Sequence, residues 1–392
     1  MKNVPVPSVI PFSQPDVGGA ELDYIAESLR GRKISGDGPF TQRCHAVLNA
    51  IYGGTAFLVH SGTAALEMAT LLIDLEPGDE VIMPSFTFTS TANAVVLRGA
   101  VPVFVDIRHD TLNIDESRIE AAVTARTKAI LPIHYAGVAA EMSAINAIAA
   151  RHGLHVIEDA AQAFGASYDE QPLGAIGDIG CLSFHETKNI TSGEGGAIII
   201  NNPVFIERAH HIREKGTNRT QFLRGEVAKY EWIDVGSSYL PSDLIAAVLL
   251  AQLERASSIN ERRMAIWNEY HRILLPLTNM GLVLPAIPKR AFHNAHIFCL
   301  RMQDNAAQQH LLRRLRERGV QATSHYVPLH SSPAGLRFGR TIGDMFNTDL
   351  AASTLVRLPL YSTLSDDQVT FTAQNTLEAV EEVIAGAVQY QL

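Results

Sequence analysis

The chain has 392 residues, of which 46% are hydrophobic and 19% are charged, and its formal net charge is −9. This composition is ordinary for a globular protein and argues against a disordered or fibrous chain. The acidic balance argues against a nucleic acid or an anionic membrane as the principal partner, so any anionic ligand would have to be bound by local donors. Cys44, Cys181 and Cys299 lie too far apart for a metal site or a disulfide framework, which fits a reducing compartment.

The N-terminal stretch is too short and too interrupted by proline for a secretory signal, and no run approaches about 18 apolar residues. We therefore expect a soluble, cytoplasmic protein. At roughly 100–200 residues per domain, the length predicts two domains. We place a large domain at residues 1–265, with an N-terminal arm to about Gly38, and a small domain at residues 266–392.

Short β-branched segments alternate with helical segments between residues 40 and 201. The expected strands are 56–59, 80–83, 101–107, 129–134, 155–158, 181–184 and 197–201. The expected helices are 40–52, a helix opening after residue 61, 87–98, 117–124 and 142–152. This alternation predicts βαβ units and a mostly parallel sheet covered on both faces. The short connection between the last two strands allows one of them to run antiparallel.

A different pattern follows residue 203. A helix ending near residue 213 leads into a polar, glycine-punctuated segment, 214–243, which is typical of a functional or interfacial loop. Ser242 or Asp243 is then expected to cap one long helix that continues towards Trp267 and Tyr270. Beyond about residue 283 we expect strands at 296–302 and 320–326 and helices at 307–318 and 366–387, which together form the small α+β domain.

Lys188 lies just past an expected strand, in a loop closed by Gly193, Gly195 and Gly196. A lysine held in such a loop can form an imine with a carbonyl cofactor, although an exposed loop lysine is the commoner explanation of this pattern alone. Ser61, Gly62 and Thr63 stand where a strand ends and a helix begins. Unpaired N–H groups and the helix dipole make this a site sized for phosphate, with an ordinary helix cap as the alternative.

Asp159 ends an expected strand at the edge where open α/β sheets bind ligands. It could keep a pyridine nitrogen protonated, or it could cap the next helix. Gln162 could hydrogen-bond a phenolic oxygen or simply be solvated, and Phe86 or Phe88 could stack on a planar cofactor or belong to the core. No P-loop or dinucleotide glycine motif occurs. In chain order, these features supply one anchor for each part of pyridoxal 5'-phosphate (PLP).

Four segments, SGTAALEMA, PSFTF, VIEDAAQAFGA and SFHETKNITSGEGGAI, closely resemble the DegT/StrS family of sugar-nucleotide aminotransferases, and the similarity covers essentially the whole chain. The resemblance implies an α/β, PLP-dependent aspartate aminotransferase-like fold (fold type I). It implies that Lys188 is the Schiff-base lysine and that Asp159 is the partner of the pyridine nitrogen. The remaining cofactor contacts that it implies are Phe88 at the ring face, Gln162 at the phenolic oxygen, and Gly62, Thr63 and Ser183 at the phosphate.

Further segments, including PIHYAGVA, REKGTNR and GSSYLPSDL, resemble the branch that aminates dTDP-4-keto-6-deoxyglucose with L-glutamate and gives dTDP-4-amino-4,6-dideoxygalactose. Enzymes of this kind serve surface-polysaccharide biosynthesis, including that of enterobacterial common antigen. Two alternatives remain open: an aminotransferase for another keto sugar nucleotide (UDP- or GDP-linked, or 3-keto), and a non-catalytic sensor. A related branch carries histidine in place of the lysine and dehydrates its substrate, so Lys188 favours transamination.

The resemblance also suggests residues for the substrate. His134, Tyr326 and His330 belong to blocks that resemble those near the sugar site, with a purely structural role equally open. The nucleotide diphosphate could meet Lys215, Arg219 and Arg224, or these side chains could be solvated. We interpret His185 as a loop residue.

The family works as a homodimer in which each active site is completed by the other subunit. Ser238 and Leu240 stand where many members carry an Asn and an Arg, and that Asn reaches the phosphate in the partner's site. A serine hydroxyl reaches less far, so this contact is in doubt here.

Overall fold

The computed structural model describes residues 9–389, so the first eight residues of the expected N-terminal arm lie outside it. The strands are β1 (Thr55–Val59), β2 (Glu80–Pro84), β3 (Val101–Val105), β4 (Thr127–Ile130), β5 (His155–Asp159), β6 (Ser167–Tyr168), β7 (Gln171–Pro172), β8 (Ile179–Ser183), β9 (Gly196–Ile200), β10 (Ala291–Phe292), β11 (Phe298–Arg301), β12 (Arg340–Thr341) and β13 (Leu355–Leu358). The helices are α1 (Glu21–Gly31), α2 (Pro39–Tyr52), α3 (Gly62–Leu72), α4 (Thr89–Val96), α5 (Glu116–Ala122), α6 (Met142–His152), α7 (Ile206–Arg213), α8 (Arg219–Leu223), α9 (Asp243–Glu254), α10 (Ala256–Leu274), α11 (Asn305–Glu317), α12 (Pro333–Phe338), α13 (Phe346–Thr354) and α14 (Asp366–Gln389).

The central element is an eight-stranded sheet in the order β1-β9-β8-β5-β4-β2-β3-β12. Strand β9 runs antiparallel to both of its neighbours, β1 and β8, and the other pairs are parallel. The predicted mostly parallel sheet and the antiparallel member among its last two strands are therefore confirmed.

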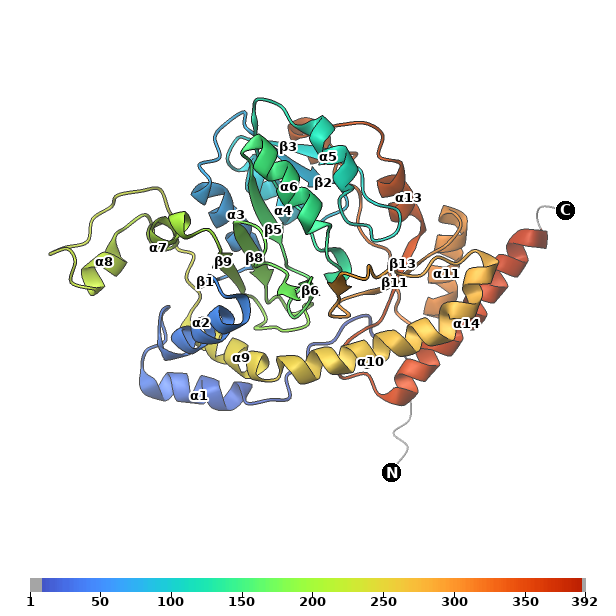
Figure 1. Cartoon of the computed structure of the whole chain (residues 1–392). Helices are drawn as coiled ribbons and strands as arrows, with labels where there is room; N and C mark the ends of the chain where they lie inside the picture. Colours follow the sequence, from blue (N-terminus) through green and yellow to red (C-terminus); the bar gives the residue numbers. More distant parts are fainter. Residues whose placement is uncertain (1–8, 390–392) are drawn as a thin grey trace.

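Helices cover both faces of this sheet (Figure 1), and alternate strand residues face opposite layers. Leu58, Val156 and Leu182 belong to a cluster with α2, α5, α6 and α9, whereas Phe57 and Ile157 belong to a second cluster with α3, α4 and α7. Strands buried on both faces read as continuous apolar runs, as the sequence showed.

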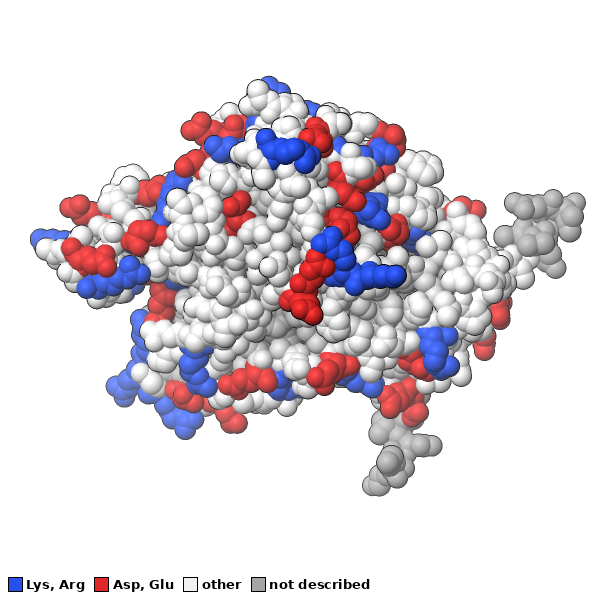
Figure 2. All heavy atoms as spheres, in the orientation of Figure 1, with Lys and Arg blue, Asp and Glu red and all other residues white. Residues whose placement is uncertain are grey.

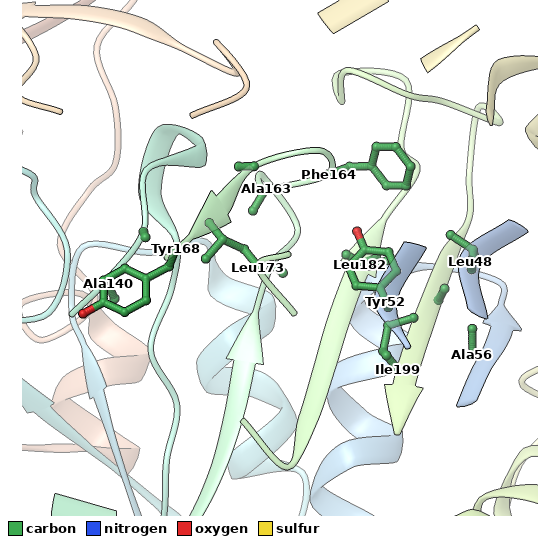
Figure 3. Packing of buried hydrophobic residues seen from close by; sticks show 14 of the residues in the cluster. Leu48, Tyr52, Ala56, Ala140, Ala163, Phe164, Tyr168, Leu173, Leu182 and Ile199 are labelled. Carbon is green, nitrogen blue, oxygen red and sulfur yellow. The ribbon is translucent and has the colours of Figure 1, made fainter. Parts of the chain in front are cut away.

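Aromatic and aliphatic side chains pack closely around β8 and β9 in the first cluster (Figure 3). The rings of Tyr52 and Phe164 lie 6.3 Å apart, and the ring of Phe164 lies 6.0 Å from that of Phe184. Burying a side chain of this size contributes about 1.5–3 kcal/mol each. This packing holds the chain rigid on either side of the Lys188 loop.

The C-terminal part adds a two-stranded antiparallel sheet, β11 and β13, and α10 and α14 lie side by side on its outer flank (Figure 1). A third hydrophobic cluster, which includes Tyr270, Phe298 and Leu311, fills the space between these elements. Ile10 belongs to this cluster as well. The proposed domain boundary at residues 265/266 falls inside α10.

The structure adds one helix to the expected elements and contradicts two expectations. The arm before Gly38 contains a helix, α1, whose Tyr24 hydroxyl donates to the Glu254 carboxylate at 2.8 Å on α9. The long helix expected from Asp243 breaks at Arg255, where φ is −104° and ψ is 2°, so that α9 and α10 are separate. Residues 320–326 form no strand and make only isolated bridges, such as that between Val320 and Ile10.

On the face drawn in Figure 2, acidic and basic side chains are interspersed. No helix within residues 9–389 combines the length and the apolar character needed to span a bilayer.

Candidate active site

A cavity of about 490 Å³ opens where the carboxyl ends of β5 and β8 meet the N-termini of α3 and α4. Residues of the C-terminal part close its other side. Among the predicted residues, the cavity wall brings together Gly62, Thr63, Phe88, Asp159, Gln162, Ser183, His185, Lys188 and Tyr326. Ligand sites of open α/β sheets are expected at this edge.

Lys188 lies in a loop that is fixed by its own hydrogen bonds. The Lys188 amide donates to the His185 carbonyl at 2.9 Å, and the neighbouring Asn189 side chain donates to the Asn294 carbonyl at 2.8 Å. Burial lowers the pKa of the Lys188 amine to about 8; the Asp159 carboxylate opposes this shift and Arg357 adds to it. An amine with this pKa is still mostly protonated at neutral pH, but its free-base fraction is far larger than that of an ordinary lysine.

Asp159 accepts two hydrogen bonds that orient its carboxylate. The Thr91 hydroxyl donates to Oδ2 at 2.8 Å, and the Ala161 amide donates to Oδ1 at 3.2 Å. Burial raises the pKa of the Asp159 carboxyl, while the hydrogen bond from Thr91 opposes the increase. A buried carboxylate of this kind is stabilised by a cationic partner, which a protonated pyridine nitrogen would supply.

A cradle for an anion lies at the N-terminus of α3. The Ser61 hydroxyl accepts from the Ala64 amide at 3.0 Å and caps the helix, and the Thr63 hydroxyl is 2.7 Å from that of Ser90. A Cβ atom on Gly62 would come within 2.8 Å of the Ser183 Cβ, so a side chain at position 62 would fill the cradle. The helix terminus and the hydroxyls fit a phosphate group.

The two phenylalanines of PSFTF have different surroundings. Phe86 is 1% exposed and packs 5.2 Å from the Tyr135 ring, whereas Phe88 is 58% exposed on the cavity wall. Phe88 is therefore the one placed to stack on a planar cofactor. Gln162 accepts from the Ala136 amide at 2.7 Å and donates to the Tyr326 hydroxyl at 3.0 Å, which keeps both side chains at the cavity.

The structure does not bring two of the predicted substrate residues to the cavity. His134 is fully buried: its Nε2 lies 2.9 Å from the Glu158 carboxylate and its Nδ1 accepts from the Ala140 amide. The prediction that His134 contacts the sugar is therefore corrected, because its ring is buried and both of its nitrogens already have hydrogen-bond partners inside the fold. His330 hydrogen-bonds the Ser85 hydroxyl at 2.9 Å and does not line the cavity.

The predicted diphosphate residues lie elsewhere on the subunit. Lys215, Arg219, Ser238 and Leu240 line a separate cleft of about 450 Å³, which we call the basic cleft, together with Lys33. In this cleft the Arg219 guanidinium donates to the Glu214 carboxylate at 2.6 Å. Arg224 does not line the basic cleft and lies 3.2 Å from the His210 ring nitrogen.

Sequence reasoning missed several residues of the cavity. Thr91 and Ser90 follow PSFTF at the start of α4, and only the fold shows that their hydroxyls point to Asp159 and Thr63. Arg263 and Arg357 also line the cavity, and they carried no motif that could have identified them.

The α/β fold of type I with this cavity at the edge of its sheet is that of the PLP-dependent aminotransferases. Within this class the chain belongs to the DegT/DnrJ/EryC1/StrS aminotransferase family, whose sequence model matches residues 15–375. Its activity is that of a sugar aminotransferase, and its cofactor is PLP.

Known relatives match this chain over nearly its whole length. The spore coat polysaccharide biosynthesis protein SpsC of Bacillus subtilis (strain 168) is 34% identical over 387 residues, which cover 96% of this chain and 98% of SpsC. The aminotransferase TlmJ from Streptoalloteichus hindustanus superposes with a TM-score of 0.88 at 30% identity and covers 95% and 99% of the two chains. The PLP form of the putative sugar aminotransferase Spr1654 from Streptococcus pneumoniae gives a TM-score of 0.88 at 26% identity, with coverage of 96% and 99%.

Proposed function

We propose that the protein transfers the amino group of L-glutamate to dTDP-4-keto-6-deoxyglucose and gives dTDP-4-amino-4,6-dideoxygalactose and 2-oxoglutarate. The observation that carries the catalytic part is the Lys188 amine, whose pKa is lowered to about 8 in a cavity shared with Asp159. The choice of sugar is supported by the segments around PIHYAGVA and REKGTNR. The similarity to a polysaccharide biosynthesis protein supports a nucleotide-linked sugar.

In our proposal, each residue of the cavity has a separate role in the reaction. When bound, PLP supplies an electron sink for the carbon that loses its proton. We assign Lys188 Nζ as the base that takes this proton and returns it, and Asp159 as the carboxylate that keeps the ring nitrogen protonated. Thr91 holds that carboxylate in position, and the cradle at Gly62 holds the phosphate.

The sugar nucleotide would be bound by two subunits. The cations Lys215 and Arg219 lie in the basic cleft and not in the cavity, so in our proposal they reach the active site of the partner in a homodimer. Helix α8 extends away from the body of the subunit (Figure 1), and exposed apolar side chains gather around it, including Leu223 (66% exposed) and Trp232 (81%). Such a surface is typical of a protein interface.

A complementation experiment tests this arrangement. Lys188→Ala and Lys215→Glu subunits should each be nearly inactive alone. Together they should recover activity, because one site of the mixed dimer has an intact lysine facing an intact basic cleft. Light scattering should show a dimer, and no recovery in a mixed dimer would place each site within one subunit.

The function itself is tested with the purified protein, L-glutamate and a panel of keto sugar nucleotides, with the products assigned by NMR. We expect turnover of the dTDP-linked 4-keto sugar. Lys188→Ala should remove the visible absorbance of the bound cofactor and abolish turnover. Conversion of only UDP- or GDP-linked or 3-keto sugars would show that the substrate is another keto sugar nucleotide. Absence of turnover with every sugar would favour the alternative of a non-catalytic sensor.

The location proposed for this reaction is the cytoplasm. Cys44, Cys181 and Cys299 are all buried free thiols, which fits a reducing compartment.

A further inference from the structure

His296, just before β11, is a cavity residue with one ring nitrogen that has no partner. Its Nδ1 lies 2.9 Å from Asn189 Oδ1, and Asn189 directly follows Lys188 in the chain. The ring is 8% exposed and lines the cavity. The other nitrogen, Nε2, makes no hydrogen bond within residues 9–389. An unpaired polar atom in so shielded a place requires an explanation.

The hydrogen bonds around Asn189 determine which nitrogen of His296 carries the proton. Asn189 Nδ2 donates to the Asn294 carbonyl at 2.8 Å and to Asn260 Oδ1 at 2.9 Å. A backbone carbonyl can only accept, so the orientation of the Asn189 amide is fixed and its Oδ1 faces His296. Because an amide oxygen also only accepts, His296 Nδ1 donates to it. Nε2 is left with a lone pair, as a hydrogen-bond acceptor.

The His296 ring is neutral, so Nε2 keeps this lone pair. Burial lowers the pKa of His296 well below its ordinary value, and the charge of Lys188 lowers it further. Smaller contributions come from Arg263, Arg357 and His325. A neutral acceptor among these groups is suited to pair with a cationic donor.

The backbone before His296 holds the ring in a defined place. Ala295 has a φ of 51°, in the left-handed region that a residue with a Cβ atom seldom adopts. Arg263 donates to the Ala295 carbonyl at 3.2 Å and to the His296 carbonyl at 2.8 Å. The His296 amide donates to Asn294 Oδ1 at 3.1 Å. These bonds stabilise a strained turn, and strain of this kind concentrates at functional sites.

Lys188 is the donor best placed to reach Nε2. The Arg263 guanidinium already donates to two carbonyls, and that of Arg357 lies over the Phe12 ring. The Lys188 amine makes no hydrogen bond within residues 9–389, although it shares the cavity with His296. Among the neighbouring charged groups, Lys188 also has the largest effect on the His296 ring.

We propose that His296 is a positioning residue for Lys188, whose protonated amine donates a hydrogen bond to His296 Nε2 when it is not bonded to the cofactor. The bond holds the amine in place between its two proton transfers and favours its charged form. This inference rests on the proposed function for the role of Lys188 as the base. It gives His296 a task that needs no change in its own protonation.

The first test measures the pKa of the Lys188 amine in the full-length protein without cofactor. The rate at which cyanate carbamoylates Lys188 is followed by peptide mass spectrometry as a function of pH, since only the free base reacts. Asp159 and Arg357, which also act on this amine, are the same in every variant.

Two substitutions separate the roles of the two ring nitrogens. In His296→Asn, the new amide can still donate to Asn189, but no acceptor remains at the position of Nε2. The pKa of the Lys188 amine should fall by about one unit or more, as expected for a lost hydrogen bond to a charged group. His296→Gln has a longer side chain that returns an acceptor to this position, and it should recover much of the shift.

His293→Asn is the matched control. His293 lies on the same segment, is 7% exposed and does not line the cavity. Its Nδ1 accepts from the Ala295 amide at 3.3 Å, a role that an asparagine oxygen can take over. The pKa of Lys188 should be unchanged in this variant. An equal fall in His293→Asn and His296→Asn, or no fall in a folded His296→Asn, would overturn the inference.

Kinetics of the PLP-loaded protein distinguish positioning from contact with a substrate. His296→Asn should slow the reaction with L-glutamate by about tenfold and leave the KM for L-glutamate within about twofold. A rise in this KM at an unchanged rate would overturn the inference, because His296 would then contact the donor. Failure of the wild type to react with L-glutamate would overturn the donor in the proposed function, and the labelling of Lys188 would still decide the role of His296.

A measurement that leaves position 296 unchanged decides the case in which His296→Asn does not fold. Nitrogen NMR of labelled histidines should show the His296 proton on Nδ1, with the signal assigned by its absence in His296→Gln. The Nε2 signal should shift in Lys188→Met, which has no amine to donate. A proton on Nε2, or an Nε2 signal that does not respond to Lys188→Met, would overturn the inference.

Discussion

The Thr91 hydroxyl donates a 2.8 Å hydrogen bond to the Asp159 carboxylate, although the two residues are 68 positions apart in the chain. Thr91 belongs to α4 and Asp159 ends β5, so the bond joins two crossover units of the sheet. Together with the hydrogen bond from the Ala161 amide to the other oxygen, it fixes the orientation of the carboxylate at the cavity.

Thr91→Val should therefore reduce kcat by about tenfold with little change in the fold, because valine keeps the shape and removes a hydrogen bond to a charged group worth about 1.5–3 kcal/mol. Thr91→Ser should retain most of the activity. Steady-state kinetics together with the absorbance spectrum of the bound cofactor check this. An unchanged kcat in Thr91→Val would show that Asp159 is positioned without Thr91.

Gly62→Ala should weaken the binding of PLP by about tenfold or more. The new Cβ would meet the Ser183 side chain at 2.8 Å, and overpacking of this kind costs about 1–3 kcal/mol. Equilibrium dialysis of PLP measures the effect. Gly31→Ala, where a Cβ would meet nothing within 4 Å, is the control and should bind PLP normally.

The Lys188 amine should make the stability of the cofactor-free protein depend on pH. Burial lowers its pKa to about 8 in the folded protein, against 10.5 for the free side chain. Below about pH 8 the amine is protonated in both states, and folding bears the full cost of burying the charge. Between about 8 and 10.5 only the unfolded chain holds the proton, so the free energy of unfolding should rise with pH.

Urea unfolding at about pH 8 and about pH 10 tests this expectation in the wild type and in Lys188→Met. The variant has no amine to titrate, so the difference between the two proteins isolates the contribution of Lys188. If their free energies of unfolding changed with pH in parallel, the amine would have an ordinary pKa.

Lys215→Gln should raise the KM for the sugar nucleotide by about tenfold, since a phosphate would lose a charged donor, and should leave the reaction with L-glutamate unchanged. Lys229→Gln is the matched control, because Lys229 lies in the same segment, 214–243, is exposed and does not line the basic cleft. A KM that responds equally in both variants would point to general electrostatics and not to a diphosphate site.

Much of the cofactor site could be predicted from the sequence because its motifs are local. Lys188, Asp159 and Gly62 each stand at the junction of a strand with a loop or helix, and the ends of parallel strands necessarily meet at one edge. Thr91 and Arg357 could not be predicted in this way. Their importance depends on partners from distant segments, and single polar residues without a pattern give no signal.

The errors in the fold have the same origin. Helix α1 packs against α9, a contact between distant segments that the sequence of the arm alone does not show. The break at Arg255 is stabilised by the ion pair with Asp16, a residue of the N-terminal arm. Periodicity within a segment contains no information about such contacts, so the sequence predicts one long helix where the structure has two.

Phe12 and Arg357 meet although they come from nearly opposite ends of the chain. On the ribosome, the sheet and the phosphate cradle emerge before β13 is made, so the wall that closes the cavity is the last part of the site to be synthesised. A nonsense mutation before β13 would therefore leave the glycine cradle intact in sequence but deprive the cavity of one wall and the C-terminal cluster of much of its core.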